Sequence, residues 1–154
     1  MRFLFIDRVT GLERGRRITG IKSFASSESF LDAHFTRTAL VPGVLLIEAM
    51  AQLLGWLVSY SLDFRCVAVL ALISDVTVPA ALKPGARAEI DGRLLTTTES
   101  DSLGAATATV DGQIVARVGR LILHHVPLPA GETARDFFLQ YAGVDDLSSL
   151  ERTA

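Results

Sequence analysis

The most apolar part of the chain is residues 44–62, a stretch of 19 residues in which Glu48 and Gln52 interrupt the apolar run near one end. Its length is close to the ~20 residues that a membrane-spanning helix needs. A carboxylate inside such a span costs about 2.5–3.5 kcal/mol or more, and no basic cluster flanks either end of the stretch. Because the segment is apolar nearly all round, we predict a helix enclosed within a globular domain and no membrane span.

Two residues mark features of this predicted helix. Pro42 precedes it, and a proline costs nothing in the first helical turn because its missing N–H is unpaired there in any case. Gly55 lies inside the helix, where glycine costs about 1 kcal/mol relative to alanine. We interpret Gly55 as a point where another backbone comes close.

Strand patterns occur on both sides of the helix. Residues 17–25 alternate loosely between apolar and polar positions before it. Four segments rich in Val, Ile, Leu, Ala and Thr follow it, at residues 66–78, 88–98, 103–110 and 114–126. The first of these four is long and apolar enough to be a central strand. Between the last two, Asp111-Gly112 is typical of a type I′ hairpin turn.

These elements predict an α+β fold in which an antiparallel sheet wraps around one long central helix. The loops between strands are too short for crossover helices, so neighbouring strands pair as hairpins, and only the apolar helix can cover one face of the sheet. A Pro- and Gly-containing segment at residues 127–131 indicates a boundary. We therefore divide the chain into a domain of residues 1–126 and a C-terminal extension of residues 127–154. The extension is expected to contain a short helix at 133–141 and a polar, loosely held tail from Asp145.

Composition limits the classes of function. The 154 residues fit one domain, and a net charge of −2 provides no field for nucleic acid. The single Cys66 excludes an intrachain disulfide and a Cys-based zinc site, and His124-His125 lacks the spacing of a metal site. The first residues do not resemble a signal peptide, so we expect a cytoplasmic protein. A mean hydropathy of +0.37 is high for a lone soluble chain and indicates a partner subunit.

Three features around the helix start could carry chemistry. Glu48 is a carboxylate in an apolar helix, so it is either the buried partner of an arginine or a proton-transferring group, and Gln52 shares its helix face. The helix N-terminus at Pro42-Gly43 offers unpaired N–H groups that could hold a carbonyl oxygen as it gains negative charge. His34 in the preceding loop is either a histidine that bonds to the backbone or a base. A base, an acid and an oxyanion site suit proton abstraction next to a thioester carbonyl.

The same residues resemble a known signature. His34-Phe35, followed by VPGVLLIEAMAQ at residues 41–52, is similar to the pattern G-H-F-P-G-x-P-x-M-P-G-V-L-x-x-E-A-M-A-Q of the 3-hydroxyacyl-[acyl-carrier-protein] dehydratases of the FabZ/FabA type. The step of 14 residues from His34 to Glu48 matches that pattern, and the likeness covers roughly residues 3–126. Ala33 replaces its first glycine, and Thr36-Arg37-Thr38-Ala39 replaces its P-G-x-P.

The resemblance implies the hotdog fold, a homodimer or higher homo-oligomer, and conversion of a (3R)-3-hydroxyacyl thioester to the trans-2-enoyl thioester. The substrate would be carried by acyl carrier protein or coenzyme A, and neither a metal nor an organic cofactor is expected. His34 is implied as the base, Glu48 of the facing subunit as the acid, and the Gly43 N–H as the group that holds the thioester oxygen. Residues expected to contact the substrate are Phe35, Val41, Pro42, Gln52 and Trp56. Two other functions stay open: a hotdog acyl thioesterase, and a weakly active acyl-binding subunit of a heteromeric dehydratase.

Overall fold

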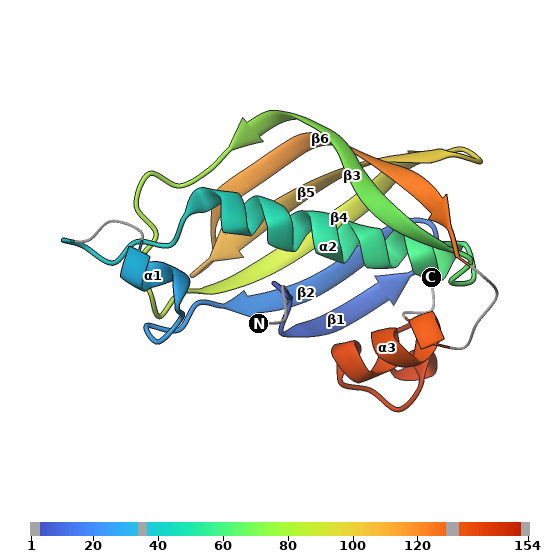
Figure 1. Cartoon of the computed structure of the whole chain (residues 1–154), viewed down its shortest axis with the longest axis horizontal. Coiled ribbons are helices and arrows are strands. Elements are labelled where there is room, and N and C mark those ends of the chain that lie inside the picture. Colours follow the sequence, from blue (N-terminus) through green and yellow to red (C-terminus); the bar gives the residue numbers. More distant parts are fainter. Residues whose placement is uncertain (1–3, 34–36, 129–132, 152–154) are drawn as a thin grey trace.

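In the computed structural model, which describes residues 4–33, 37–128 and 133–151, six strands form one antiparallel sheet wrapped around a long helix (Figure 1). The strands are β1 (Arg8–Glu13), β2 (Arg17–Ser23), β3 (Cys66–Thr77), β4 (Arg87–Thr97), β5 (Asp101–Val110) and β6 (Gln113–Pro127). The helices are α1 (Phe30–Ala33), α2 (Gly43–Ser61) and α3 (Thr133–Ala142), followed by a short 3-10 helix at Leu147–Ser149. The predicted α+β fold with a central helix is confirmed.

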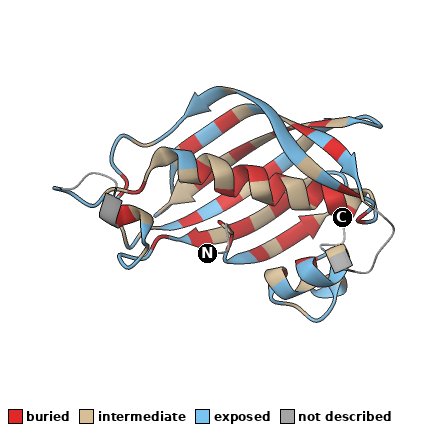
Figure 2. Ribbon diagram, viewed as in Figure 1, coloured by how far each residue is buried: buried red, intermediate tan, exposed pale blue. Residues whose placement is uncertain are grey.

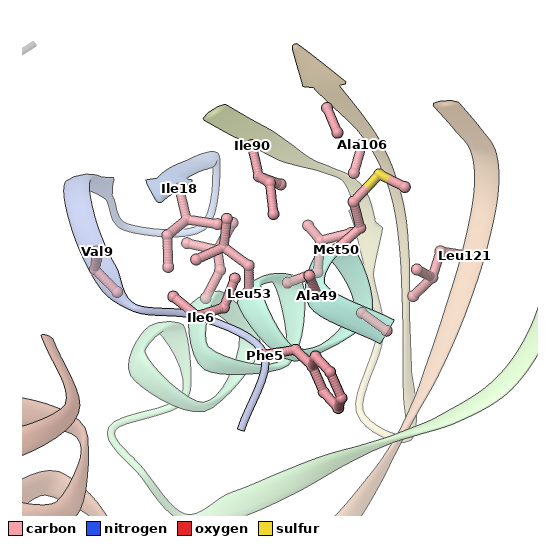
Figure 3. Packing of buried hydrophobic residues seen from close by; sticks show 14 of the residues in the cluster. Phe5, Ile6, Val9, Ile18, Ala49, Met50, Leu53, Ile90, Ala106 and Leu121 are labelled. Carbon is pink, nitrogen blue, oxygen red and sulfur yellow. The ribbon is translucent and has the colours of Figure 1, made fainter. Parts of the chain in front are cut away.

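Helix α2 is the core helix of the fold. It is apolar and long enough to cross a membrane, yet ten of its residues are buried within the domain. Side chains from the sheet and from residues 4–7, the N-terminal segment before β1, surround it. Phe5, Ile90 and Leu121 lie in this way around Ala49 and Met50 (Figure 3). Its bounds differ by one residue from the prediction, and Pro42 is the N-cap and not part of the first turn.

Strand β3 lies at the edge of the sheet, so the prediction of a central strand is wrong. The strand order is β1-β2-β4-β5-β6-β3, and β3 pairs with β6. Figure 2 shows β3 exposed along most of its length. The prediction was based on apolar residues on both faces of the strand, a pattern usually produced by burial between layers. Here the apolar side chains are exposed in the single chain, with Val69 at 49% and Leu72 at 48%.

The hairpin predicted at Asp111-Gly112 is confirmed. Asp111 and Gly112 have φ values of 50° and 78°, as a type I′ turn requires, and they connect the paired residues Val110 and Gln113. Strand β1 is not among the strands predicted from the sequence. It pairs with β2 across a register shift between Val9 and Gly11, which breaks the alternation that marks a strand.

The C-terminal extension is packed against α2 and β1 (Figure 1). Phe138 and Ala142 of α3 are fully buried in the same core as the sheet and α2. The tail after Asp145, expected to be loosely held, is fixed up to Glu151. The Leu12 N–H donates to the Leu150 carbonyl oxygen at 2.9 Å, and Leu12 and Glu151 form a parallel bridge. These backbone bonds cover part of the edge of β1.

Candidate active site

The first turn of α2 is held in place by the chain that precedes it. The Val41 N–H donates to the Leu82 carbonyl oxygen at 2.7 Å, which ties the helix start to the segment between β3 and β4. Pro42 is the N-cap with φ −59° and ψ 127°, and it forms no side-chain cap. Within the part of the chain that the structure describes, no side chain accepts from the N–H groups of the first turn, where the positive end of the helix dipole lies.

Glu48 lies one and a half turns further along α2. Its Oε1 accepts a hydrogen bond of 2.7 Å from Nε2 of Gln52, one turn away on the same face of the helix. Both side chains are half-buried. None of the ion pairs among the described residues involves Glu48, so an amide and not an arginine is its partner there.

Gln52 is held at its other end by the N-terminal segment. Its Oε1 accepts a hydrogen bond of 2.9 Å from the backbone N–H of Phe5. The amide oxygen is thereby directed at Phe5 and the amide nitrogen at Glu48, which fixes the orientation of the side chain. The arrangement gives the Glu48 carboxyl group one defined direction.

Of the other predicted site residues, His34 and Phe35 cannot be placed and Trp56 can. His34 and Phe35 lie outside the described residues, so their predicted roles stay predictions. Trp56 is two turns beyond Glu48 on α2, half-buried, and packs on α3 with ring centroids 5.8 Å from Phe137 and 5.1 Å from Phe138. Its predicted contact with substrate also stays a prediction.

Two residues that were not predicted as site residues from the sequence hold the part of the chain that reaches Gln52. They are Phe5, through its backbone N–H, and Tyr141 of α3, whose Oη accepts the Ile6 N–H at 3.0 Å. A backbone donor has no signature in the sequence. Tyr141 is the last residue of the short amphipathic helix predicted at 133–141, and its separation of 135 residues from Ile6 gives no sign of the contact.

The two adjacent histidines of β6 do not act together. His124 is exposed and its Nδ1 lies 2.9 Å from Oδ1 of Asp101, whereas His125 is buried with Nε2 2.9 Å from Oγ of Ser102. Successive residues of a strand point to opposite faces of the sheet, so the two imidazoles cannot bind one ion. In the described part of the chain, no group of three or more His, Cys, Asp or Glu side chains is placed to hold a metal.

Comparison with known proteins shows the family of the chain. The FabA-like domain family matches residues 1–118, which include the whole of α2 and its Glu48. The chain belongs to the FabA-like family. The 3-hydroxyacyl-[acyl-carrier-protein] dehydratase FabZ of Bacillus subtilis (strain 168) is 32% identical over 118 residues, covering 75% of this chain and 83% of that protein. The FabZ of Hydrogenobaculum sp. (strain Y04AAS1) is 34% identical over 116 residues, covering 73% of this chain and 78% of the relative.

Solved structures share the fold at lower identity. The dehydratase heterocomplex ApeI:P from Xenorhabdus doucetiae superposes with a TM-score of 0.67 at 16% identity, covering 88% of this chain and 89% of that one. The protein smu.793 from Streptococcus mutans UA159, solved bound to acetyl CoA, gives a TM-score of 0.63 at 19% identity, covering 84% of this chain and 95% of that one. These likenesses concern the fold alone, and the fold of this FabA-like chain is the hotdog fold.

Proposed function

We propose that this FabA-like chain removes water from a (3R)-3-hydroxyacyl thioester on acyl carrier protein and releases the trans-2-enoyl thioester. The observation that carries the proposal is the Glu48 carboxylate, oriented by Gln52 at 2.7 Å on the helix whose N-terminus has no side-chain cap. An oriented carboxyl group and the N–H groups at the helix start supply a proton donor and a site for an oxygen that gains negative charge. The FabZ relatives, named as 3-hydroxyacyl-[acyl-carrier-protein] dehydratases, support the same reaction.

In the proposed mechanism, His34 takes the proton from C2 of the acyl chain. The electrons of that C–H bond form the C2=C3 double bond, passing through an enolate whose oxygen is stabilised by the Gly43 N–H. Glu48, acting as the general acid, gives a proton to the C3 hydroxyl, which leaves as water. Phe35, Val41, Pro42 and Trp56 are proposed to contact the acyl group and its linker. The reaction uses these protein groups and requires neither a metal nor an organic cofactor.

We also propose that the active form is a homodimer joined through β3. Six large apolar side chains of this edge strand are exposed in the single chain, at 37% to 49%: Val67, Val69, Leu70, Leu72, Ile73 and Val76. A long apolar edge strand is an aggregation hazard unless a partner covers it. A second copy of β3, running antiparallel about a two-fold axis, would satisfy its free backbone edge and bury these side chains.

The dimer is tested by the mass in solution of the wild-type chain and of the variant Val69→Glu/Leu72→Glu. Light scattering should give twice the mass of 16.6 kDa, or a higher multiple, for the wild type. The double variant should dissociate or precipitate because it places carboxylates in the proposed interface, whereas Ile114→Glu, which changes an apolar side chain that is 67% exposed on β6, should not change the mass. A monomeric wild type at micromolar concentration would contradict the proposal.

The reaction is tested by mass spectrometry with 3-hydroxyacyl substrates of several chain lengths on acyl carrier protein and on coenzyme A. We expect loss of one water from the acyl carrier at a rate that Glu48→Gln lowers by about 10²-fold. Release of free acid and a free carrier thiol would instead identify an acyl thioesterase. Binding of acyl carrier without either product would identify the acyl-binding subunit of a heteromeric enzyme. We place the reaction in the cytoplasm, where carrier-bound acyl chains would be supplied to it.

A further inference from the structure

Helix α3 contacts the N-terminal segment, whose Phe5 N–H orients Gln52. The N–H groups of two successive residues in the N-terminal segment are bound by different helices: Phe5 donates to Oε1 of Gln52 on α2 at 2.9 Å, and Ile6 donates to Oη of Tyr141 on α3 at 3.0 Å. Phe5 and Ile6 are both buried, at 6% and 4% exposed. The N-terminal segment is therefore fixed between the two helices.

Helix α3 is firmly placed, so the hydroxyl of Tyr141 has a defined position. The Tyr141 ring lies 5.9 Å from that of Trp56 and stacks on Phe137 at 6.1 Å. Phe138, on the same helix, is fully buried and lies 5.7 Å from Phe64. Aromatic contacts of this kind join α3 to α2 directly. Residues 133–142 lie beyond the part of the chain that the FabA-like family matches, which ends at residue 118.

The Phe5 N–H is a donor that helps to orient the Gln52 amide. If that donor moved away, the amide could rotate and direct its oxygen at Glu48, where two acceptor atoms would face each other. The Phe5 N–H belongs to the backbone and cannot be removed by substitution of its own side chain. The neighbouring N–H, that of Ile6, is held by a side chain, because it donates to the hydroxyl oxygen of Tyr141.

We propose that Tyr141 is a positioning residue for the reaction: through Ile6 and Phe5 it keeps Gln52 oriented, and Gln52 in turn orients the carboxyl group of Glu48. The proposal deepens the dehydration proposed above and rests on Glu48 as its proton donor. It gives the C-terminal extension a role in turnover, although no residue of the extension touches Glu48 in the described structure. A small displacement of a catalytic group is costly, since about 1 Å can lower a rate by ~10²-fold.

The test compares two tyrosine-to-phenylalanine variants. Tyr141→Phe removes the hydroxyl that binds Ile6, and Tyr60→Phe removes a hydroxyl of α2 that bonds to Glu151 in the same extension without contacting Gln52 or Glu48. Tyr141→Phe should lower kcat by about tenfold with KM changed by less than about twofold. Tyr60→Phe should leave both constants near the wild-type values. Equal effects of the two variants on kcat would mean a general structural role and overturn the proposal.

A double-mutant cycle shows whether the effect passes through Gln52. In a Gln52→Ala background, Tyr141→Phe should have no further effect on kcat, because the group through which it acts is gone. If kcat of the double variant is instead lowered by the product of the two single effects, the proposal is contradicted.

An NMR measurement separates this proposal from the proposed reaction. The side-chain NH₂ signals of Gln52, assigned by their loss in Gln52→Met, should shift in Tyr141→Phe and stay in place in Tyr60→Phe. If the Gln52 signals shift only in Tyr141→Phe but the wild type releases no enoyl product, the orientation of Gln52 by Tyr141 is supported and the proposed dehydration is wrong. If they are the same in wild type and Tyr141→Phe, the positioning role is wrong whatever the activity.

Discussion

A β-carbon placed on Gly43 would lie 2.7 Å from Cβ of Val78 and 3.0 Å from its Cγ2. Gly43 is the first residue of α2, and Val78 directly follows β3. The helix start, which carries the proposed oxyanion N–H, therefore rests directly against the end of the edge strand. Glycine is needed there because any side chain would push the two apart.

Gly43→Ala is expected to displace the start of α2. Overpacking of this kind costs about 1–3 kcal/mol of unfolding free energy, and a displaced N–H should lower kcat by at least about tenfold. The matched control is Gly43→Ala with Val78→Gly, which removes the side chain that clashes. Denaturant unfolding and turnover of both variants check the prediction: partial recovery in the double variant is expected, and an unchanged single variant would contradict it.

Gly55→Ala is expected to stabilise the protein. The added β-carbon would lie 3.6 Å from the Ala68 carbonyl oxygen and 3.8 Å from Ala68 Cβ, which are ordinary contact distances. Alanine is favoured over glycine inside a helix by about 0.5–1 kcal/mol. Denaturant unfolding should show this gain with kcat unchanged. A loss of stability would mean that α2 and β3 must come closer in the assembled protein than in the single chain.

Mixing two inactive variants should restore activity if each site uses His34 of one subunit and Glu48 of the other. His34→Ala and Glu48→Gln should each lower turnover by about 10²-fold or more, because each removes a proton-transferring group. After subunit exchange at equal concentrations, half of the dimers should be mixed and hold one intact site, which gives about a quarter of wild-type activity. Mixed dimers verified by mass that stay inactive would show that both residues act from the same chain.

Stability should fall in alkaline solution partly because of Tyr141. Burial raises the pKa of Tyr141 to about 12, from 10.0. Between pH 10 and pH 12 the unfolded chain has lost this proton and the folded chain has kept it, so the unfolded state binds fewer protons and the free energy of unfolding decreases as pH rises. The contribution is present in full below pH 10 and is lost by about pH 12.

Denaturant unfolding across this range, for wild type and Tyr141→Phe, checks the pH prediction. The variant should lose stability less steeply with pH. Tyr60 has its pKa raised by burial as well, so Tyr60→Phe is a suitable companion variant whose slope should also be shallower than that of the wild type. Parallel curves for wild type and Tyr141→Phe would contradict the prediction.

The sequence by itself determined the elements whose signals are local. A run of 19 residues that is apolar nearly all round had to be enclosed, and α2 spans Gly43–Ser61. Asp111-Gly112 adopts the positive φ values that its residue types favour, and β5 and β6 follow from that turn. The candidate carboxylate could also be found, since Glu48 stood out against the apolar residues around it.

Only the tertiary structure decided which elements become neighbours. A strand buried within one chain and an edge strand covered by a second subunit have the same apolar pattern. The place of β3 at the edge could therefore not be predicted from its residues. The tail after Asp145 is polar in sequence yet fixed by backbone bonds to β1, which any residue type can make. Gln52 is oriented through two contacts of backbone N–H groups. The Phe5 N–H binds Gln52, 47 positions away along the chain, and the Ile6 N–H binds Tyr141, 135 positions away. Backbone donors are present at every residue except proline, and only the fold selects the few that reach the site.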